Sequence, residues 1–152
     1  MELNWWYFAI KLAAYAGWMV PGLKWFSSVK RPVAVRAVVL GALRLMMGLG
    51  FGLIIWVVGS LVYAGVGELT GDREVLANAA TYLAVYVPVR WIEWAIFDLV
   101  LSPESRSPKG FLAGVSGKHR AWRLGGIAVS CLADIPVVIS LGGFLPVGRF
   151  MC

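Results

Sequence analysis

Six ionisable side chains lie inside long apolar runs of this chain, where charged groups are uncommon. They are Lys11, Arg44, Arg90, Glu93, Asp98 and Asp134, three of each sign. A charge in an apolar run pairs with another charge or borders a polar cavity, because burying it alone is costly. Such a set can bind a small charged solute, relay protons or lock helices together.

Opposite charges fall at similar depths when residues are counted from the end of each run that lies nearest a basic connection. At about 1.5 Å per residue, Arg44 lies about 13 Å deep and Glu93 about 12 Å, while Arg90 lies about 16 Å deep and Lys11 and Asp134 about 18 Å. We predict the pairs Arg44–Glu93 and Arg90–Asp134, with Lys11 in the same deeper layer. An alternative stays open, because Arg90 and Glu93 are three residues apart and can pair along one helix.

Further polar side chains share helix faces with these charges, because residues three or four apart lie on one face. The first run aligns Asn4, Tyr7, Lys11, Tyr15 and Trp18, the third aligns Tyr82, Tyr86, Arg90 and Glu93, and the fourth aligns Gly126, Ser130 and Asp134. We therefore add Tyr86 and Ser130 to the candidate substrate-binding or charge-pairing residues. Asp98 lies nearer its basic end and is predicted to meet Arg36. Three faces unsuited to lipid predict a bundle interior or an oligomer interface.

The elements that must position these residues are four apolar helices. The chain is 60% hydrophobic and 14% charged, whereas soluble domains average about 45–50% and about 25%. The apolar runs cover about 5–23, 33–65, 76–101 and 122–147, and each approaches or exceeds the roughly 20 residues that cross a bilayer. The predicted fold is an all-α integral membrane protein, a four-transmembrane-helix bundle that forms a single membrane domain over 1–152.

Lysines and arginines gather in two of the connections between these runs. Nine of the 14 lie in segments 24–36 and 102–123, whereas Arg73 and Arg149 are the two on the opposite side. Cytoplasmic loops carry such an excess of positive residues. Both basic loops are therefore predicted to be cytoplasmic and both termini non-cytoplasmic. We expect the cytoplasmic membrane of a prokaryote, because no organelle address is recognisable.

Glycines and prolines shape the expected packing. Gly41, Gly48, Gly52 and Gly59 share one face of the second run, and small residues on one face let another helix approach closely. We expect this packing inside the monomer, with a dimer face as the alternative. Pro88 and Pro136 are expected to kink their helices, because proline removes a backbone hydrogen bond. The freed carbonyls would form a mid-membrane polar pocket of the kind that transporters build from broken helices, unless the kinks only fit the bundle.

The sequence contains no recognisable catalytic set. His119 is the one histidine, so a multi-histidine metal site cannot form, and its basic neighbours predict a surface loop. Cys131 and Cys152 make neither a disulfide framework nor a metal motif. The net charge of +6 is explained by the loops, so no nucleic-acid partner is expected. We predict no cofactor, no metal and no enzymatic activity.

Two functions remain for a small multi-pass membrane protein of this kind. The first is a transporter or channel in which the charged layer binds a small polar or charged solute or relays protons. The alternative is a non-catalytic structural or accessory subunit of a larger membrane complex, with the same charges locking the fold. The expected partners are the lipid bilayer and either further copies of the chain or other membrane subunits.

Overall fold

The computed structural model describes residues 5–27, 32–70 and 74–140, and over these ranges the chain is all-helical. The elements in order are α1 (Trp5–Phe26), α2 (Val33–Thr70), α3 (Glu74–Thr81), the π-helix η1 (Tyr82–Tyr86), α4 (Val87–Leu101), the 3-10 helix η2 (Pro103–Arg106), α5 (Pro108–Ala113) and α6 (Gly117–Ser140). Asn4 and positions 141–147 of the predicted fourth run lie outside the described residues.

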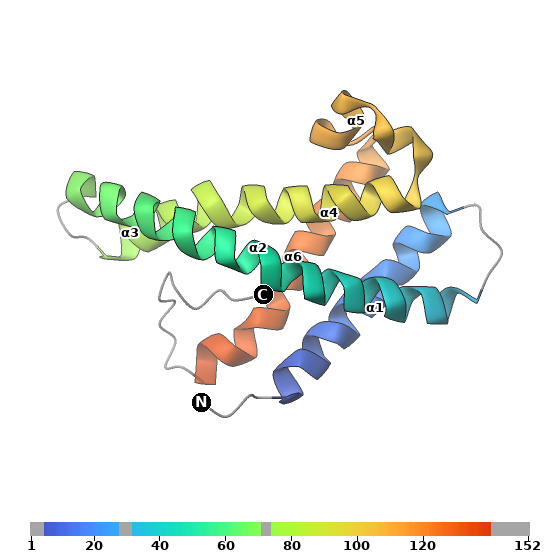
Figure 1. Ribbon diagram of the computed structural model, residues 1–152, viewed down its shortest axis with the longest axis horizontal. Helices are drawn as coiled ribbons and strands as arrows, with labels where there is room; N and C mark the ends of the chain where they lie inside the picture. Colours follow the sequence, from blue (N-terminus) through green and yellow to red (C-terminus); the bar gives the residue numbers. More distant parts are fainter. Residues whose placement is uncertain (1–4, 28–31, 71–73, 141–152) are drawn as a thin grey trace.

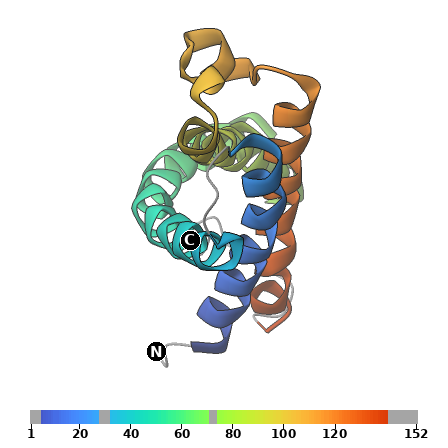
Figure 2. The same cartoon turned by 90° about the vertical axis from the view of Figure 1, so that its right-hand side faces the viewer.

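The long helices form two crossing pairs. In Figure 1, α2 runs along the long axis of the molecule beside the continuous stretch of α3, η1 and α4, and α1 and α6 cross this pair obliquely. Viewed end on in Figure 2, α1 and α6 lie side by side, and α1 packs against α2. The short helix α5 packs against the end of α4. Each long helix therefore contacts at least two others.

A narrow stripe of α2 faces the rest of the chain. Its buried residues recur three or four positions apart and are mostly small: Ala37, Leu40, Gly41, Arg44, Gly48, Gly52, Ile55 and Gly59. A Cβ on Gly41 would lie 2.8 Å from the backbone nitrogen of Ala16, so the close approach of α1 requires glycine there. All four predicted packing glycines are thus buried within the chain itself.

The rest of α2 is exposed and apolar. One described helix, spanning Val33–Leu69, is long and apolar enough to cross a membrane, and only 22% of its most apolar window is buried. The side chains on this surface include Val39, Met46, Leu53, Trp56 and Leu61. A surface of this kind is uncommon on monomeric soluble proteins, which rarely expose large apolar patches.

Tryptophans packed onto glycines join α1, α4 and α6. Trp18 Nε1 donates to the Trp122 carbonyl at 3.0 Å, and Trp122 Nε1 donates back to the Trp18 carbonyl at 3.3 Å. A Cβ added to Gly125 would lie 2.2 Å from Trp18 Cζ2, and one added to Gly126 would lie 2.4 Å from Trp94. Only glycine leaves room for these indoles against the α6 backbone.

The two prolines have different surroundings. Pro88 is the second residue of α4, immediately after η1 and Val87. The Val87 N–H donates to the Tyr82 carbonyl five residues back, as in a π-helix. The missing N–H of Pro88 is thus accommodated by a local widening of the helix, a common cause of bending. Pro136 lies inside α6, which continues to Ser140.

We predict that Gly125→Ala will destabilise the fold, because the new methyl group would overlap the Trp18 ring. Overpacking of this kind costs about 1–3 kcal/mol. The matched control is Gly17→Ala in α1, where nothing lies within 4 Å of the added Cβ. Thermal unfolding in detergent should separate the two variants. Equal unfolding temperatures for the two variants would show that the Trp18 ring does not pack closely against Gly125.

Candidate charged site

Glu93 lies between two arginines in the interior. Its Oε2 accepts from Arg44 Nη2 at 2.5 Å and from Arg90 Nη1 at 2.8 Å. All three side chains have 0% exposure, so water does not screen their charges. The structure confirms the predicted contact between Arg44 and Glu93, and it realises the alternative in which Arg90 pairs with Glu93 along one helix.

This cluster carries a formal charge of +1, which aromatic rings help to hold. The Arg44 guanidinium carbon lies 5.0 Å from the centroid of the Tyr15 ring and 5.4 Å from that of Trp94, and Arg90 lies 4.7 Å from that of Tyr86. A desolvated cation over an aromatic face gains about 2 kcal/mol. The rings also offset the cost of Arg44 Nε and Nη1, which have no hydrogen-bond partner among the described residues.

Asp134 forms a second cluster where α1, η1 and α6 meet. Its Oδ1 lies 2.7 Å from Lys11 Nζ and accepts from the Tyr7 hydroxyl at 2.8 Å, while Oδ2 accepts from the Tyr86 hydroxyl at 2.9 Å. Lys11 also sits 4.7 Å from the Tyr7 ring centroid. The partner of Asp134 is therefore Lys11, where the first prediction had Arg90, because Arg90 is held by Glu93 one turn along its own helix.

The two clusters differ in their access to solvent. The Asp134 side chain is 14% exposed, whereas Lys11 and the whole Glu93 cluster are at 0%. Asp134 is also held by a lysine, whose ammonium is a mobile point charge, whereas Glu93 is held by two planar guanidinium groups. An incoming solute or proton could reach Asp134 far more readily than Glu93.

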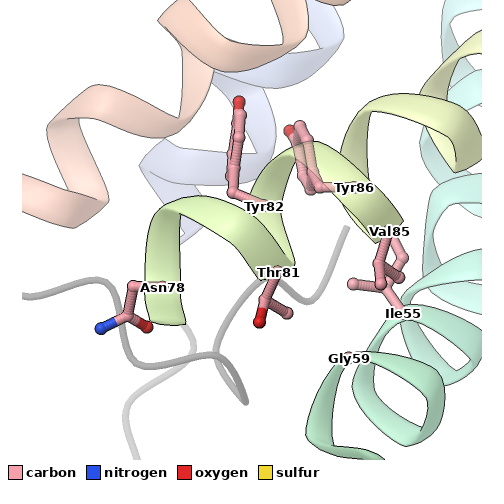
Figure 3. Close-up of a pocket in the computed structure, with 7 residues that line it drawn as sticks. All are labelled: Ile55, Gly59, Asn78, Thr81, Tyr82, Val85 and Tyr86. Atoms are coloured by element: carbon pink, nitrogen blue, oxygen red, sulfur yellow. The ribbon is translucent and has the colours of Figure 1, made fainter. Parts of the chain in front are cut away.

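A small cavity lies next to the π-helix. It has a volume of about 10 Å³, room for about one water molecule. Its lining residues are Ile55, Gly59, Asn78, Thr81, Tyr82, Val85 and Tyr86. Figure 3 shows Tyr82 and Tyr86 projecting together on one side of η1, with Asn78 and Thr81 pointing elsewhere. The two rings stack at 4.5 Å, and this cavity is too small for a solute larger than water.

A third cluster surrounds Asp98, and here the sequence prediction is wrong. Asp98 does not pair with Arg36, which instead donates to Ser27 Oγ. Asp98 accepts from His119 Nδ1 at 2.7 Å and from Arg123 Nε at 2.8 Å. His119 was expected on the surface but is buried, stacked on Phe26 with 4.1 Å between ring centroids.

The reason lies in the connection between α4 and α6, which falls in segment 102–123, the segment that the sequence predicts to be a basic cytoplasmic loop. Helix α5 folds back beside α4 and ends at Gly114, whose φ of 74° favours glycine. Helix α6 then begins at Gly117, before the predicted start of the fourth run. Arg123 is thereby buried and donates to the carbonyls of Phe111 and Gly110 at 2.5 and 2.8 Å.

This third cluster does not form a catalytic triad. The Ser105 hydroxyl lies 3.4 Å from His119 Nδ1, the same ring nitrogen that contacts Asp98. A triad requires the serine and the carboxylate on opposite ring nitrogens. Ser130, a predicted site residue, donates to the Gly126 carbonyl and accepts from Trp94 Nε1. Its hydroxyl therefore supports the α4–α6 contact.

No protein-family model matches the chain, and neither a curated protein nor a solved structure is significantly similar to it. Within the described ranges, no group of three or more His, Cys, Asp or Glu side chains could hold a metal ion. The function must therefore be argued from the three charged clusters and the surface around them.

We predict that Glu93→Gln will destabilise the protein more than Arg44→Gln. The first change leaves two buried arginines facing each other, and an uncompensated buried charge costs about 3–5 kcal/mol. The second leaves Arg90 and Glu93 as a balanced pair. Glu104→Gln at an exposed position is the control. Thermal unfolding in detergent should rank the variants. A larger drop in unfolding temperature for Arg44→Gln than for Glu93→Gln would contradict the argument from buried net charge.

Proposed function

We propose that this chain is a four-span membrane protein that acts as a non-catalytic structural subunit of a larger membrane complex. Its distribution of side chains supports membrane embedding. Lys11, Arg44, Arg90, Glu93 and Asp98 are fully buried, while large apolar side chains lie exposed along the long helices. Charges inside and apolar groups outside suit a hydrocarbon solvent, because charged residues are almost never fully buried unless they are paired.

The helix lengths are compatible with four crossings. At about 1.5 Å per residue, the 22 residues of α1 and the 24 of α6 extend about 33 and 36 Å, and a bilayer core is about 30 Å thick. The ion-paired residues lie mostly on α1, α4 and α6. Their charges lower the mean hydropathy of these helices below that of α2. Neutral pairing reduces the cost of placing these helices in lipid.

The observation that carries the structural role is the direct pairing of Glu93 with Arg44 and Arg90. These groups contact one another without exposure, so they do not line a hydrated path. Moving a solute past them would require breaking bonds whose loss leaves a buried charge. This geometry favours charges that hold the bundle together.

A partner surface is available at the tip of the hairpin formed by α2 and α3. In Figure 1 this hairpin extends beyond α1 and α6. Leu61 and Leu69 of α2 are 71% and 87% exposed, and Leu83 of the adjoining η1 is 66% exposed. Two helices without neighbours on their flanks suit contact with another membrane helix, so we propose that the partner subunit docks there.

Transport is the second candidate, and the exposure of Asp134 favours it. This carboxylate is the accessible member of the deep charges, and Lys11 and two tyrosine hydroxyls surround it. Lysine, aspartate and tyrosine together can relay protons or bind a small polar or charged solute. Under this hypothesis α1 and α6 form the functional half of the molecule.

The proposed topology predicts that residues 68 and 109 lie on opposite sides of the membrane. Single cysteines at Glu68 and Lys109, both exposed, would be introduced after Cys131 and Cys152 are replaced by serine. An impermeant maleimide should label position 68 in spheroplasts and position 109 only in inside-out vesicles. If α2 alone crosses the membrane, both positions lie on one side and label together.

The subunit role predicts that gentle purification recovers unlike chains in fixed stoichiometry. A photo-crosslinking residue at Leu61 should capture the partner. The same residue at Met46, which is similarly exposed on α2 (64%) but away from the tip, should not. Mass spectrometry identifies the captured chain and its ratio to this protein.

A homogeneous particle containing only this chain would contradict the subunit role. If that particle also carried proton flux in vesicles, reported by a pH-sensitive dye, the transport hypothesis would replace it. The flux should then fall in Asp134→Asn and persist in Glu104→Gln. Flux unchanged by Asp134→Asn and Arg90→Gln would exclude transport through the charged layer.

A further inference from the structure

A groove with apolar walls and one arginine lies on the first two turns of α2. Its volume is about 290 Å³, and it is lined by Pro32, Val35, Arg36, Val39 and Leu40. This volume is near the lower limit of ligand pockets. The walls offer no polar partner apart from the guanidinium, so an occupant must be largely apolar with one anionic group.

The Arg36 guanidinium is oriented but not saturated. Its Nη1 donates to Ser27 Oγ at 3.0 Å, which links the start of α2 to the end of α1. The other N–H groups make no hydrogen bond to the described residues. Arg36 is also free of the carboxylate that sequence reasoning assigned to it, because Asp98 is taken by Arg123 and His119. The groove therefore has a positive end that no acidic side chain among the described residues neutralises.

The position of the groove identifies the occupant. In the proposed orientation Arg36 lies at the cytoplasmic surface, and the apolar wall of Val35 and Val39 continues from it along α2 into the bilayer. Trp25 and Lys24, both exposed near the end of α1, are side chains typical of the headgroup level. Basic pockets at the cytoplasmic side of membrane helices bind anionic lipid headgroups.

We propose that this groove binds an anionic phospholipid, with the phosphate on Arg36 and an acyl chain along Val35 and Val39. This inference rests on the membrane embedding and orientation of the proposed function. A lipid fits both features at once: its phosphate matches the guanidinium, and its chain covers the exposed valines. For a second copy of this chain to occupy the groove instead, it would have to place an acidic side chain against Arg36.

The test is retention of phosphatidylglycerol during native mass spectrometry. Protein would be taken from vesicles of phosphatidylcholine and phosphatidylglycerol in equal amounts. Arg36→Gln should reduce bound phosphatidylglycerol about fivefold, the effect of about 1 kcal/mol per arginine at an anionic surface. Val39→Trp, which fills the groove without changing charge, should also reduce it. Lys109→Gln on α5 is the matched charge control and should retain the lipid.

Three results would overturn the proposal. Equal loss in Lys109→Gln and Arg36→Gln would mean diffuse attraction between the basic loops and the membrane. Displacement of the lipid by inorganic phosphate would mean that Arg36 binds the phosphate alone and that the apolar wall of the groove does not contribute to binding. A dimer that forms without phosphatidylglycerol and is lost in Val39→Trp would mean that a second copy occupies the groove.

Controls separate this test from the membrane proposal itself. Arg36→Lys keeps the charge and should restore part of the retention, and all variants should unfold at the wild-type temperature in phosphatidylcholine alone. If the retention of phosphatidylglycerol falls only in variants that also unfold earlier there, the loss reflects a damaged fold and the lipid assignment fails. Failure of the four-span topology would appear independently, as labelling of positions 68 and 109 on one side.

Discussion

The bond from one glutamate to two arginines is the interaction on which the rest of this structure depends. Glu93, Arg44 and Arg90 are all withdrawn from water, so separating them would leave unpaired buried charges. Arg44 reaches Glu93 only because α2 lies close to its neighbours, and small residues one turn away on either side, Gly41 and Gly48, line the same stripe. The surplus positive charge requires electron-rich ring faces, which α1 and α4 supply. The position of three helices therefore follows from one pairing.

Two further carboxylates extend this constraint to the remaining helices. Asp98 joins α4 to α6, and through Arg123 it also holds α5. Asp134 joins α6 to Lys11 of α1 and to Tyr86 of η1. Apolar contacts alone tolerate sliding, but a shift of one helical turn, about 5.4 Å, would break every one of these pairs. The ion pairs therefore define the register of the bundle, and the indole contacts with glycine fill the spaces between them.

Sequence reasoning could find features that depend on regular helices. Counting depth along straight helices paired Arg44 with Glu93, because the α-helix is regular from the basic end of each run to these residues, over 33–44 in α2 and 93–101 in α4. The same method failed for Asp98, whose partners come from a connection that reverses direction through α5 and buries His119 and Arg123. It also assigned Arg90 to Asp134, since depth alone does not distinguish a partner on the same helix from one across the bundle. The π-helix before Pro88 was foreseen only as a kink, because the proline predicts a lost bond but not how the backbone compensates.

The contrast between the two deep carboxylates bears directly on what the protein can do. A charge that takes part in transport must exchange partners, and Glu93 has no second arrangement that avoids leaving an arginine unpaired. Asp134 differs, because Lys11 also rests against the Tyr7 ring and so retains a favourable contact if the carboxylate is neutralised. Any exchange of charge partners is therefore easier between α1 and α6 than between α2 and α4, where both arginines depend on Glu93. The exposed apolar hairpin of α2 and α3 lies beside this fixed pairing, and this is why we propose the structural role ahead of transport.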